Sequence, residues 1–389
     1  MKKKIAILGS TGSIGKTLIN ILKQDKKNFE IVLLSAEENY KELLKQAKLF
    51  KVKNLIITNY ESFLKIKKNS YSKKIKIFNN FDSYKTIFKN KVDYTMSSIT
   101  GIEGLKPTLK IIKHSKKIAI ANKESIICGW SLINKELKKN KTEFIPVDSE
   151  HFSLWYGLKN IDTNLIETIY LTASGGPFYL TPLKKIKNAN INEALKHPNW
   201  RMGNKISIDS ATMINKVFEV IEAKNIFNIP YNKIRILIHP KSYVHSIIKS
   251  QNGLIKIIAH DTTMQIPIFN TLFFNSKKKI KSDKIKIKLL NELNFNKVNL
   301  NRYPVVKILN LLPNKHSLYE TIIVSANDCL VDLYLKKLIN FNDIQSNLFE
   351  LIKSKEFIKY KKISPQKLKD ILDLNNYVRL KVKEKVYKS

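Results

Sequence analysis

Cysteine is scarce in this sequence, which contains only Cys128 and Cys329. Two cysteines cannot build the disulfide framework of a small secreted domain. We interpret both as reduced, partly buried thiols, because free cysteines usually behave as small core residues. A nucleophilic role for Cys128 stays open, because it lies near the polar run ANKES.

Long hydrophobic runs are also missing, since no stretch of about eighteen consecutive apolar residues occurs. We therefore expect no membrane partner. The first residues, MKKKIAILGS, pass from lysines directly into a strand-like run. A signal peptide would need a longer apolar segment and a cleavage site of small residues. These absences predict a cytoplasmic protein.

Acidic residues are few: 32 Asp and Glu stand against 70 Lys and Arg, for a formal net charge of +38. Such an excess favours non-specific association with nucleic acid. However, the lysines are spread along the whole chain, and the aromatic residues form no obvious platform for stacking bases. We do not expect nucleic acid as a partner, and a basic nucleic-acid-binding protein remains an alternative.

Residues 1–147 alternate short β-branched runs with amphipathic stretches such as KTLINILKQ and KELLKQAKLF. This alternation is typical of βαβ units. It predicts an α/β fold with an N-terminal Rossmann-like domain, in which helices cover a parallel sheet. The runs that we expect to be strands are IAIL, IVLLSA, NLIIT, KIKIF, VDYTMSS, KIAIAN and EFIPV.

The amino-acid composition changes after residue 147. Residues 148–274 are rich in Gly, Pro, Ser, Thr and His, and they predict a central α+β catalytic domain. Its expected strands include IYLTAS, IRILIHP, KSYVHSIIKS and GLIKIIAH, of which the last two are candidates for a dimer interface. The lysine-rich residues 275–299 predict an exposed linker, and residues 300–389 predict a C-terminal helical bundle.

A glycine-rich loop, GSTGSIG, follows the expected strand IAIL and precedes an expected helix. Gly9, Gly12 and Gly15 permit a tight turn and let backbone N–H groups approach a pyrophosphate. The spacing is a variant of the dinucleotide fingerprint, and an ordinary turn is the alternative. Glu37 and Glu38 follow the second expected strand, where acidic side chains favour NAD over NADP.

Asp148 and Glu150 lie two residues apart in PVDSEH, at the end of a run that we expect to be extended. A period of two places both side chains on one face. Two carboxylates so close repel each other unless a cation lies between them or one is protonated. Mg²⁺ or Mn²⁺ with oxygen ligands fits this pair, and two solvated loop acids are the alternative.

The run HPNWRMGNKISIDSATMINKVFE combines groups suited to a phosphate and to a metal. Asn215, Lys216 and Glu219 share one face of an expected helix. Ser210 stands near the N-terminus of that helix, where an anion is favoured. We expect Ser210, Asn215 and Lys216 to hold a phosphate and Glu219 to complete a metal site; a surface Lys–Glu pair is the alternative.

Neighbouring runs add further candidates. HPNWRMG offers Trp200 and Gly203 for a segment that closes over a ligand, and a loop whose Trp packs in the core is the alternative. Ser174, in LTASGGPF, adds a hydroxyl beside two glycines. Lys123, in ANKES, follows the strand KIAI at the sheet edge where ligands bind. We interpret His151 as structural.

Together these runs resemble the 1-deoxy-D-xylulose 5-phosphate reductoisomerase family. The matching runs occur in order over nearly the whole length: GSTGSIG, ANKES, PVDSEH, GGPF, HPNWRMGNKISIDSATMINK with Glu219, HPKSYVHS and, more weakly, SANDCL. The resemblance implies that a sugar phosphate is rearranged by retro-aldol and aldol steps. The product is then reduced by NADPH to 2-C-methyl-D-erythritol 4-phosphate, in the non-mevalonate isoprenoid route. A homodimer and a divalent metal (Mg²⁺, Mn²⁺ or Co²⁺) are also implied.

The resemblance further implies roles for individual residues. Three carboxylates would hold the metal: Asp148, Glu150 and Glu219. The phosphate would be held by Ser174, Ser210, Asn215 and Lys216, with His197 beside them. Lys123 and Ser149 would contact the substrate backbone, and Trp200 would cover the substrate as part of the lid HPNWRMG. The cofactor site would be lined by Thr11, Gly12, Ser13, Ile14, Asn39, Asn122, Glu124 and Gly203.

Glu37 and Glu38 depart from the family pattern, in which many relatives carry a basic or small residue after the second strand. We nevertheless expect NADPH, because other positive groups of this basic protein can meet the 2′-phosphate. Another NAD(P)-dependent reductase of a small phosphorylated substrate, for instance a semialdehyde dehydrogenase that uses Cys128, is the alternative.

Overall fold

The protein is described here by a computed structural model, which covers residues 2–69, 75–187, 189–200, 202–274 and 276–388. The chain forms two compact units. The first contains residues 1–125, 132–152 and 263–281, and the second contains residues 126–131, 153–262 and 282–389. The compact units divide the chain at other points than the expected domain boundaries. Those boundaries, at 147/148, 274/275 and 299/300, stay a prediction. Within the described residues, no helix has the length and apolar character to span a membrane.

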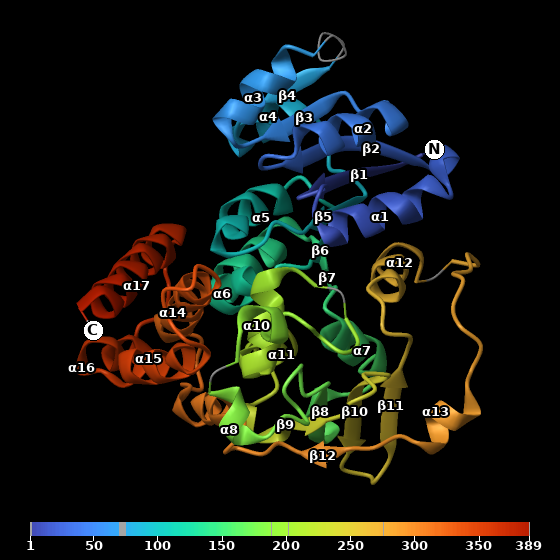
Figure 1. Ribbon diagram of the computed structural model, residues 1–389. Helices are drawn as coiled ribbons and strands as arrows, with labels where there is room; N and C mark the ends of the chain where they lie inside the picture. Colours follow the sequence, from blue (N-terminus) through green and yellow to red (C-terminus); the bar gives the residue numbers. More distant parts are fainter. Residues whose placement is uncertain (1, 70–74, 188, 201, 275, 389) are drawn as a thin grey trace. The chain divides into compact units, whose positions relative to one another are not determined.

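The first unit is built on a seven-stranded parallel sheet with the strand order β4-β3-β2-β1-β5-β6-β7 (Figure 1). Each of the seven runs expected to be strands in residues 1–147 contributes one of them, which confirms the Rossmann-like prediction. The order reverses between β1 and β5, and open α/β sheets bind ligands at such a point. The strands are β1 (Lys3–Leu8), β2 (Phe29–Ala36), β3 (Asn54–Ile57), β4 (Lys76–Phe78), β5 (Tyr94–Ser97), β6 (Lys117–Ile120) and β7 (Glu143–Pro146).

Burial explains why β1 reads as a continuous apolar run. Its residues 5–8, Ile-Ala-Ile-Leu, have no exposed surface, because helices cover both faces of a parallel sheet. The next helix, α1, instead buries one stripe that includes Leu18, Ile19 and Leu22. The helices of this unit are α1 (Ser13–Lys23), α2 (Tyr40–Phe50), α3 (Tyr60–Lys67), α4 (Tyr84–Ile87), α5 (Leu105–Ile112), most of α6 (Lys123–Asn140) and α12 (Gln265–Phe273), with 3₁₀ turns η1 (Lys26–Asn28), η3 (Phe81–Ser83) and η4 (Ile102–Gly104).

Helix α12 belongs to this first unit although it lies far along the chain. The Phe273 ring meets the Phe29 ring edge-on at a centroid distance of 5.6 Å. The Tyr94 and Thr271 hydroxyls are hydrogen-bonded at 2.7 Å. These contacts complete the core of the parallel sheet with a segment that local sequence patterns assigned to the central domain.

The second unit contains a five-stranded mixed sheet with the order β11-β10-β8-β9-β12. Strand β10 is antiparallel to β8 and β11, whereas β8 and β9 run parallel. All four strands expected here are present, and β12 adds an edge from the lysine-rich region. The strands are β8 (Ile166–Ala173), β9 (Ile234–Ile238), β10 (Val244–Ser250), β11 (Ile255–Ala259) and β12 (Asn296–Lys297).

Helices dominate the last part of the second unit, as expected. In the orange and red part of Figure 1, α14 lies beside α15 and α17. The helices of the unit are α7 (Ser149–Gly157, which begins in the first unit), α8 (Leu183–Ile186), α9 (Ile191–Ala194), α10 (Asn204–Thr212), α11 (Ile214–Phe227), α13 (Ile287–Asn291), α14 (Leu318–Leu335), α15 (Phe341–Lys353), α16 (Lys355–Ile358) and α17 (Leu368–Lys388), with 3₁₀ segments η5 (Thr163–Leu165), η6 (Tyr231–Lys233), η7 (Pro304–Leu311) and η8 (Lys359–Lys362).

We predict that Gly15→Ala destabilises the first unit. The added Cβ would lie 2.4 Å from the Gly9 carbonyl oxygen and 2.5 Å from the Ser10 Cα, so the loop would have to move. The expected loss in the free energy of unfolding is about 1–3 kcal/mol, measured by urea denaturation. Gly12→Ala is the control, because its Cβ would come no closer than 3.5 Å to the loop. Equal stability of the two variants would contradict the prediction.

Candidate active site

The glycine loop lies at the carboxyl ends of β1 and β5, where the strand order reverses. Gly9 has φ +76°, and a Cβ there would lie 2.6 Å from the Ser98 carbonyl oxygen. The Gly12 N–H donates to the Gly9 carbonyl at 3.2 Å, so the loop folds back on itself. The expected cofactor residues of this loop are exposed or half-buried: Thr11, Gly12, Ser13 and Ile14. Their position suits a pyrophosphate at the N-terminus of α1.

Two other expected cofactor residues cap helices at the same edge of the sheet. Asn39 begins α2, and its side chain accepts a hydrogen bond from the Glu42 N–H at 3.1 Å. Asn122 begins α6, and its side chain donates to the Gly101 carbonyl at 2.7 Å. Glu37 and Glu38 are exposed between β2 and α2, as their place in the sequence indicates.

Asp148 and Glu150 do not lie on an extended strand, so that prediction was wrong. Strand β7 ends at Pro146, and α7 begins at Ser149. Asp148 caps this helix, because its carboxylate accepts from the Ser149 N–H at 3.0 Å and its carbonyl from the Phe152 N–H at 2.7 Å. An acid suits this position because its side chain satisfies an N–H group that has no partner within the helix.

Asp148 pairs with a lysine from the start of α6. Its Oδ2 lies 3.1 Å from the Lys123 Nζ and 3.7 Å from the His151 Nδ1. Burial would raise the pKa of the Asp148 carboxyl, but the Lys123 ammonium and the His151 ring together lower it well below its usual range. Asp148 is therefore a carboxylate. The role of His151 beside it was missed, because the i, i+3 spacing carries meaning only once α7 is known to be a helix.

Glu219 sits on α11 with the two donors that the sequence places on its face. Its carboxylate accepts hydrogen bonds from the Asn215 amide and the Lys216 ammonium. The side chains of Lys216 and Glu219 are only 5% and 2% exposed, so this is a buried ion pair. Ser149 likewise donates to the Glu150 carboxylate, at 2.6 Å.

Ser210 does not stand at the start of α11, contrary to the sequence prediction. It lies in the last turn of α10, which ends at Thr212. Met213, with φ +72°, separates α10 from α11, so the run ATMINKVFE is not one continuous helix. The left-handed backbone at Met213 turns the chain sharply, and a single-helix pattern cannot reveal such a turn.

Ser174 and His197 meet at hydrogen-bonding distance. The Ser174 Oγ lies 3.0 Å from the His197 Nε2. The His197 Nδ1 accepts from the N–H groups of Asn199 and Trp200, at 3.2 and 3.0 Å. Because Nδ1 accepts, the neutral ring carries its proton on Nε2 and donates to Ser174. Burial, with a smaller contribution from the Lys216 charge, lowers the pKa of His197 to about 4.

The loop that carries Ser174 packs against the end of α10. Gly176 has φ +66°, and a Cβ there would lie 2.7 Å from the Ser210 carbonyl oxygen. Tyr303 holds the adjacent residue, because its hydroxyl donates to the Gly175 carbonyl at 2.6 Å. The second unit thus brings two of the expected phosphate residues, Ser174 and Ser210, onto neighbouring backbone segments.

The expected lid is anchored to the segment HPKSYVHS. Asn199 donates from its side chain to the Pro240 carbonyl at 2.6 Å and to the Ser242 hydroxyl at 2.8 Å. The Trp200 ring meets the His245 ring edge-on at 6.2 Å. Trp200 is half-buried and Gly203 is exposed, so the aromatic ring is not part of a closed core. Closure of this segment over a ligand stays a prediction.

The three expected metal ligands are divided between the units, with Asp148 and Glu150 in the first and Glu219 in the second. All offer carboxylate oxygens, which magnesium prefers. Within its own unit, Asp148 faces the Lys123 ammonium and Glu219 faces the Lys216 ammonium. These lysines offset part of the negative charge of the two acids. The fit to a divalent cation rests on the carboxylate oxygens that the three residues offer.

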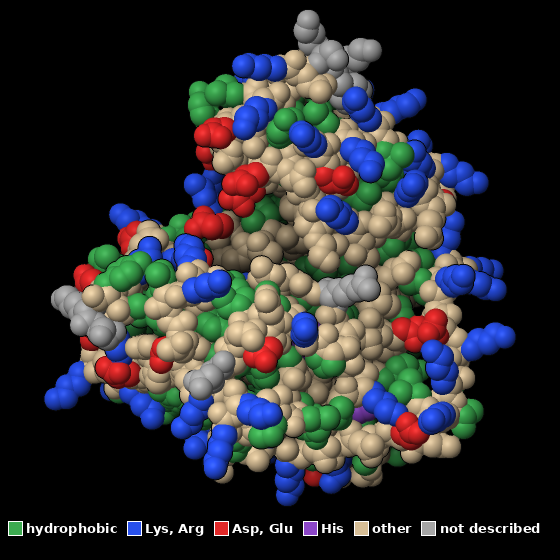
Figure 2. Space-filling view, viewed as in Figure 1, with side chains coloured by type: hydrophobic (Ala, Val, Ile, Leu, Met, Phe, Trp, Pro, Cys, Tyr) green, Lys and Arg blue, Asp and Glu red, His purple; other side chains and the backbone are tan. Residues whose placement is uncertain are grey.

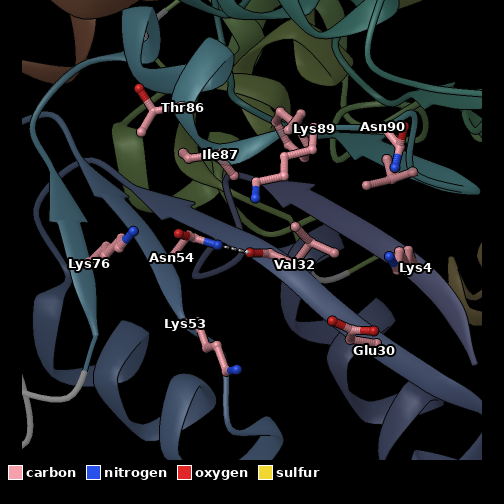
Figure 3. A pocket seen from close by; sticks show the side chains of 12 residues that line it. Lys4, Glu30, Val32, Lys53, Asn54, Lys76, Thr86, Ile87, Lys89 and Asn90 are labelled. Carbon is pink, nitrogen blue, oxygen red and sulfur yellow. Dashed lines mark hydrogen bonds between the residues drawn. The ribbon is translucent and has the colours of Figure 1, made fainter.

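Other features of the structure do not point to a function. Cys128 is fully buried within α6, which disfavours its use as a nucleophile. A cleft of about 570 Å³ lies at the amino ends of β1 to β4, away from every expected site residue. Its lysines, labelled in Figure 3, do not converge on one point. The Lys and Arg side chains visible in Figure 2 are scattered, with no single basic patch on that face.

Comparison with known families gives matches along the chain. A family model described as 1-deoxy-D-xylulose 5-phosphate reductoisomerase matches residues 5–129. The model of the C-terminal domain of that enzyme matches residues 144–227. A model described as DXP reductoisomerase C-terminal domain matches residues 261–381.

Curated proteins and solved structures agree with these matches. A 1-deoxy-D-xylulose 5-phosphate reductoisomerase from Pelagibacter ubique is 59% identical over 98% of both chains. The protein of that name from Clostridium kluyveri is 36% identical over 99% of this chain and 100% of the relative. The Zymomonas mobilis enzyme in complex with NADPH superposes with a TM-score of 0.88, at 28% identity and with 99% of both chains covered. A DOX-P reductoisomerase in complex with NADPH, fosmidomycin and magnesium superposes with a TM-score of 0.90 at 28% identity, over 99% of this chain and 98% of the other.

A glycine loop at the switch point of a parallel sheet and a buried acid held by amide and ammonium donors are typical of nucleotide-dependent enzymes that act on phosphorylated substrates. Within that class, the chain belongs to the 1-deoxy-D-xylulose 5-phosphate reductoisomerase family. The family resemblance found in the sequence is thereby confirmed, and the enzyme is an NADP-dependent oxidoreductase.

We predict that His197 stays neutral, with its proton on Nε2, down to about pH 5, because its pKa is about 4. The unfolded ring titrates near 6.5, so between these values the unfolded state binds more protons than the folded state. The stability that this group contributes is complete above about pH 6.5 and is lost as the pH falls toward 4. Nitrogen NMR of the imidazole rings measures this, with His197→Gln identifying the signal. A midpoint at or above pH 6 would contradict the prediction.

Proposed function

We propose that this protein converts 1-deoxy-D-xylulose 5-phosphate to 2-C-methyl-D-erythritol 4-phosphate, with NADPH and one divalent metal ion, as a step toward isoprenoid precursors. The observation that carries the proposal is the buried Lys216–Glu219 pair with Asn215, next to the Ser174–His197 hydrogen bond. The amide of Asn215 and the ammonium of Lys216 can donate to a phosphate, and the carboxylate of Glu219 can bind a metal ion. Full-length similarity to enzymes of this activity supports the assignment.

The cofactor site that we propose lies at the carboxyl ends of the first sheet. Backbone N–H groups of residues 11–14, at the start of α1, would receive the pyrophosphate. The helix-capping residues Asn39 and Asn122, with Glu124 and Gly203, would complete the site. Bound NADPH supplies the hydride for the reduction. Relatives solved with NADPH support this choice over NADH, although Glu37 and Glu38 are acidic.

Asp148, Glu150 and Glu219 are the residues that would hold the metal, which we expect to be Mg²⁺, Mn²⁺ or Co²⁺. A divalent ion held there supplies a Lewis acid that stabilises negative charge on substrate oxygens while the carbon–carbon bond breaks. Ser149 and Lys123 would contact the substrate beside these acids. The Lys123 ammonium and the His151 ring lower the pKa of Asp148, and the ionised carboxylate is the form that binds a metal.

The phosphate would be held away from the reacting carbons by Ser174, Ser210, Asn215 and Lys216. Binding energy gained at a remote group can orient the substrate and close the lid. His197 donates from Nε2 in its neutral form, so it offers a hydrogen bond without taking a proton from the phosphate. Trp200, three residues further along, would cover the substrate and exclude water.

A homodimer is also proposed. Strand β11 forms an edge of the second sheet, and its residues Ile255 and Ile257 are 58% and 50% exposed, with Leu254 beside them at 68%. An exposed apolar edge strand promotes aggregation of a monomer, whereas a dimer can bury it in the interface between subunits. A cytoplasmic location is proposed too, and the two buried, free cysteines support it.

Replacing Glu219 by Gln should lower metal-dependent turnover at least about 100-fold, since a ligand is lost where even supporting residues cost 10- to 100-fold. Turnover is measured as NADPH oxidation with the deoxyxylulose phosphate, and metal affinity by Mn²⁺ titration. Glu167→Gln is the matched control, because Glu167 forms an exposed ion pair with Lys249 at 2.7 Å. Full turnover and metal affinity in the Glu219 variant would remove this residue from the ligand set.

We predict a higher kcat/KM with NADPH than with NADH, measured on one preparation. Glu38→Ala should raise kcat/KM for NADPH up to about fivefold, because it removes a charge that repels the 2′-phosphate at an exposed site. Glu30→Ala is the control, since Glu30 is exposed near the opposite end of the same strand. Preference for NADH in the unmodified protein would overturn the cofactor assignment.

A further inference from the structure

A buried polar cluster connects α10 to the C-terminal helix α14. The Asn327 side chain on α14 donates to the Asp209 Oδ1 on α10 at 2.8 Å. Asp209 is 1% exposed and Asn327 is fully buried. Neither residue is among the metal, phosphate or cofactor residues discussed above. Burial of a carboxylate is costly unless it is paired and hydrogen-bonded, so this contact calls for an explanation.

Lys205 ties the same two helices together a second time. Its Nζ lies 2.9 Å from the Asp209 Oδ2, one helical turn further along α10, and 2.9 Å from the Asp328 Oδ1 on α14. It also lies over the Phe218 ring of α11, at 5.5 Å from the centroid. One ammonium therefore joins α10, α11 and α14, all within the second unit.

The cluster lies next to Ser210 in the chain. Asp209 immediately precedes Ser210 in the last turn of α10, and Met213 ends that helix with φ +72°. On the other side, the Ser210 carbonyl packs against Gly176. A helix moves as a rod, so fixing Asp209 fixes the neighbouring Ser210 hydroxyl to within the small tolerance that a binding site needs. The amino end of α10 also follows the expected lid directly.

We propose that Asp209, Asn327 and Lys205 are positioning residues, through which the C-terminal helices set the phosphate-binding geometry of Ser210. The inference rests on the proposed phosphate role of Ser210. By this inference the C-terminal helices contribute to substrate binding indirectly, through their contacts with α10. A well-packed apolar pair would stabilise the fold about as well as such a buried polar cluster, but it would lack the directional bonds that fix one orientation of α10.

The test uses the full-length protein with NADPH, and inorganic phosphate as the probe. Phosphate affinity is measured by competition against the sugar-phosphate substrate, and NADPH affinity is measured separately. Asn327→Leu should weaken phosphate binding about 10- to 100-fold, as expected for a residue that orients a ligand group. It should raise KM more than it lowers kcat, and NADPH affinity should stay within twofold of the unmodified protein. Asp332→Asn is the control, because it breaks an exposed Asp–Lys pair on the same helix.

The exchange variant Asp209→Asn with Asn327→Asp keeps one amide, one carboxylate and the net charge. It should recover most of the lost phosphate affinity. Unchanged phosphate affinity in a folded Asn327→Leu protein would overturn the proposal, and so would a parallel loss of NADPH affinity or a failure of the exchange to restore binding. If Asn327→Leu does not fold, Asp328→Asn tests the Lys205 contact instead, with the same expected direction and the same criterion.

Ser210→Ala separates this inference from the proposed function. If this variant binds phosphate as tightly as the unmodified protein does, the phosphate role of Ser210 is wrong. If Ser210→Ala weakens phosphate binding while Asn327→Leu and Asp328→Asn leave it unchanged, the role of Ser210 stands and only the positioning inference fails.

Discussion

The pairing of buried or half-buried carboxylates with lysines is the interaction on which this structure depends. Asp148 faces Lys123, Glu219 faces Lys216, and Asp209 faces Lys205. An isolated carboxylate could not be taken out of water at these places, because its desolvation would cost several kcal/mol. Each lysine offsets part of that cost by placing a positive charge beside its acid. With 70 basic and 32 acidic residues, the chain has ample cations for this purpose.

The same pairs serve different ends. Asp148 and Glu219 belong to the set proposed to hold a metal, and their lysine partners, Lys123 and Lys216, belong to the set proposed to bind the substrate. Asp209 has a structural partner, Asn327, and anchors a helix. The pairs differ in burial and in their neighbours: Asp209 is 1% exposed and contacts Asn327 on α14, whereas Asp148 is half-buried and contacts His151. The same type of ion pair therefore occurs both in the proposed site and between the helices that pack around Asp209.

Periodicity predicted the strands well, because a strand buried on both faces leaves a continuous apolar run such as Ile5–Leu8. The candidate residues were found for a similar reason, as Ser174, His197 and Lys216 stand in short runs of unusual composition. Local patterns failed where the backbone changed direction. Asp148 was placed on a strand although it caps α7, and Ser210 was placed on α11 although Met213 ends the preceding helix. One residue with a left-handed backbone leaves no periodic signal.

The sequence by itself determined the parallel sheet, the glycine loop, the family and the residue types available for a metal and a phosphate, because each depends on chemistry carried by neighbours in the chain. Only the tertiary structure decided that α12 completes the core of the first unit, that His197 donates to Ser174 through Nε2, and that Asn327 donates to Asp209. These contacts join residues separated by long stretches of chain. Packing and burial determine which of these residues meet, and local sequence patterns carry no information about such contacts.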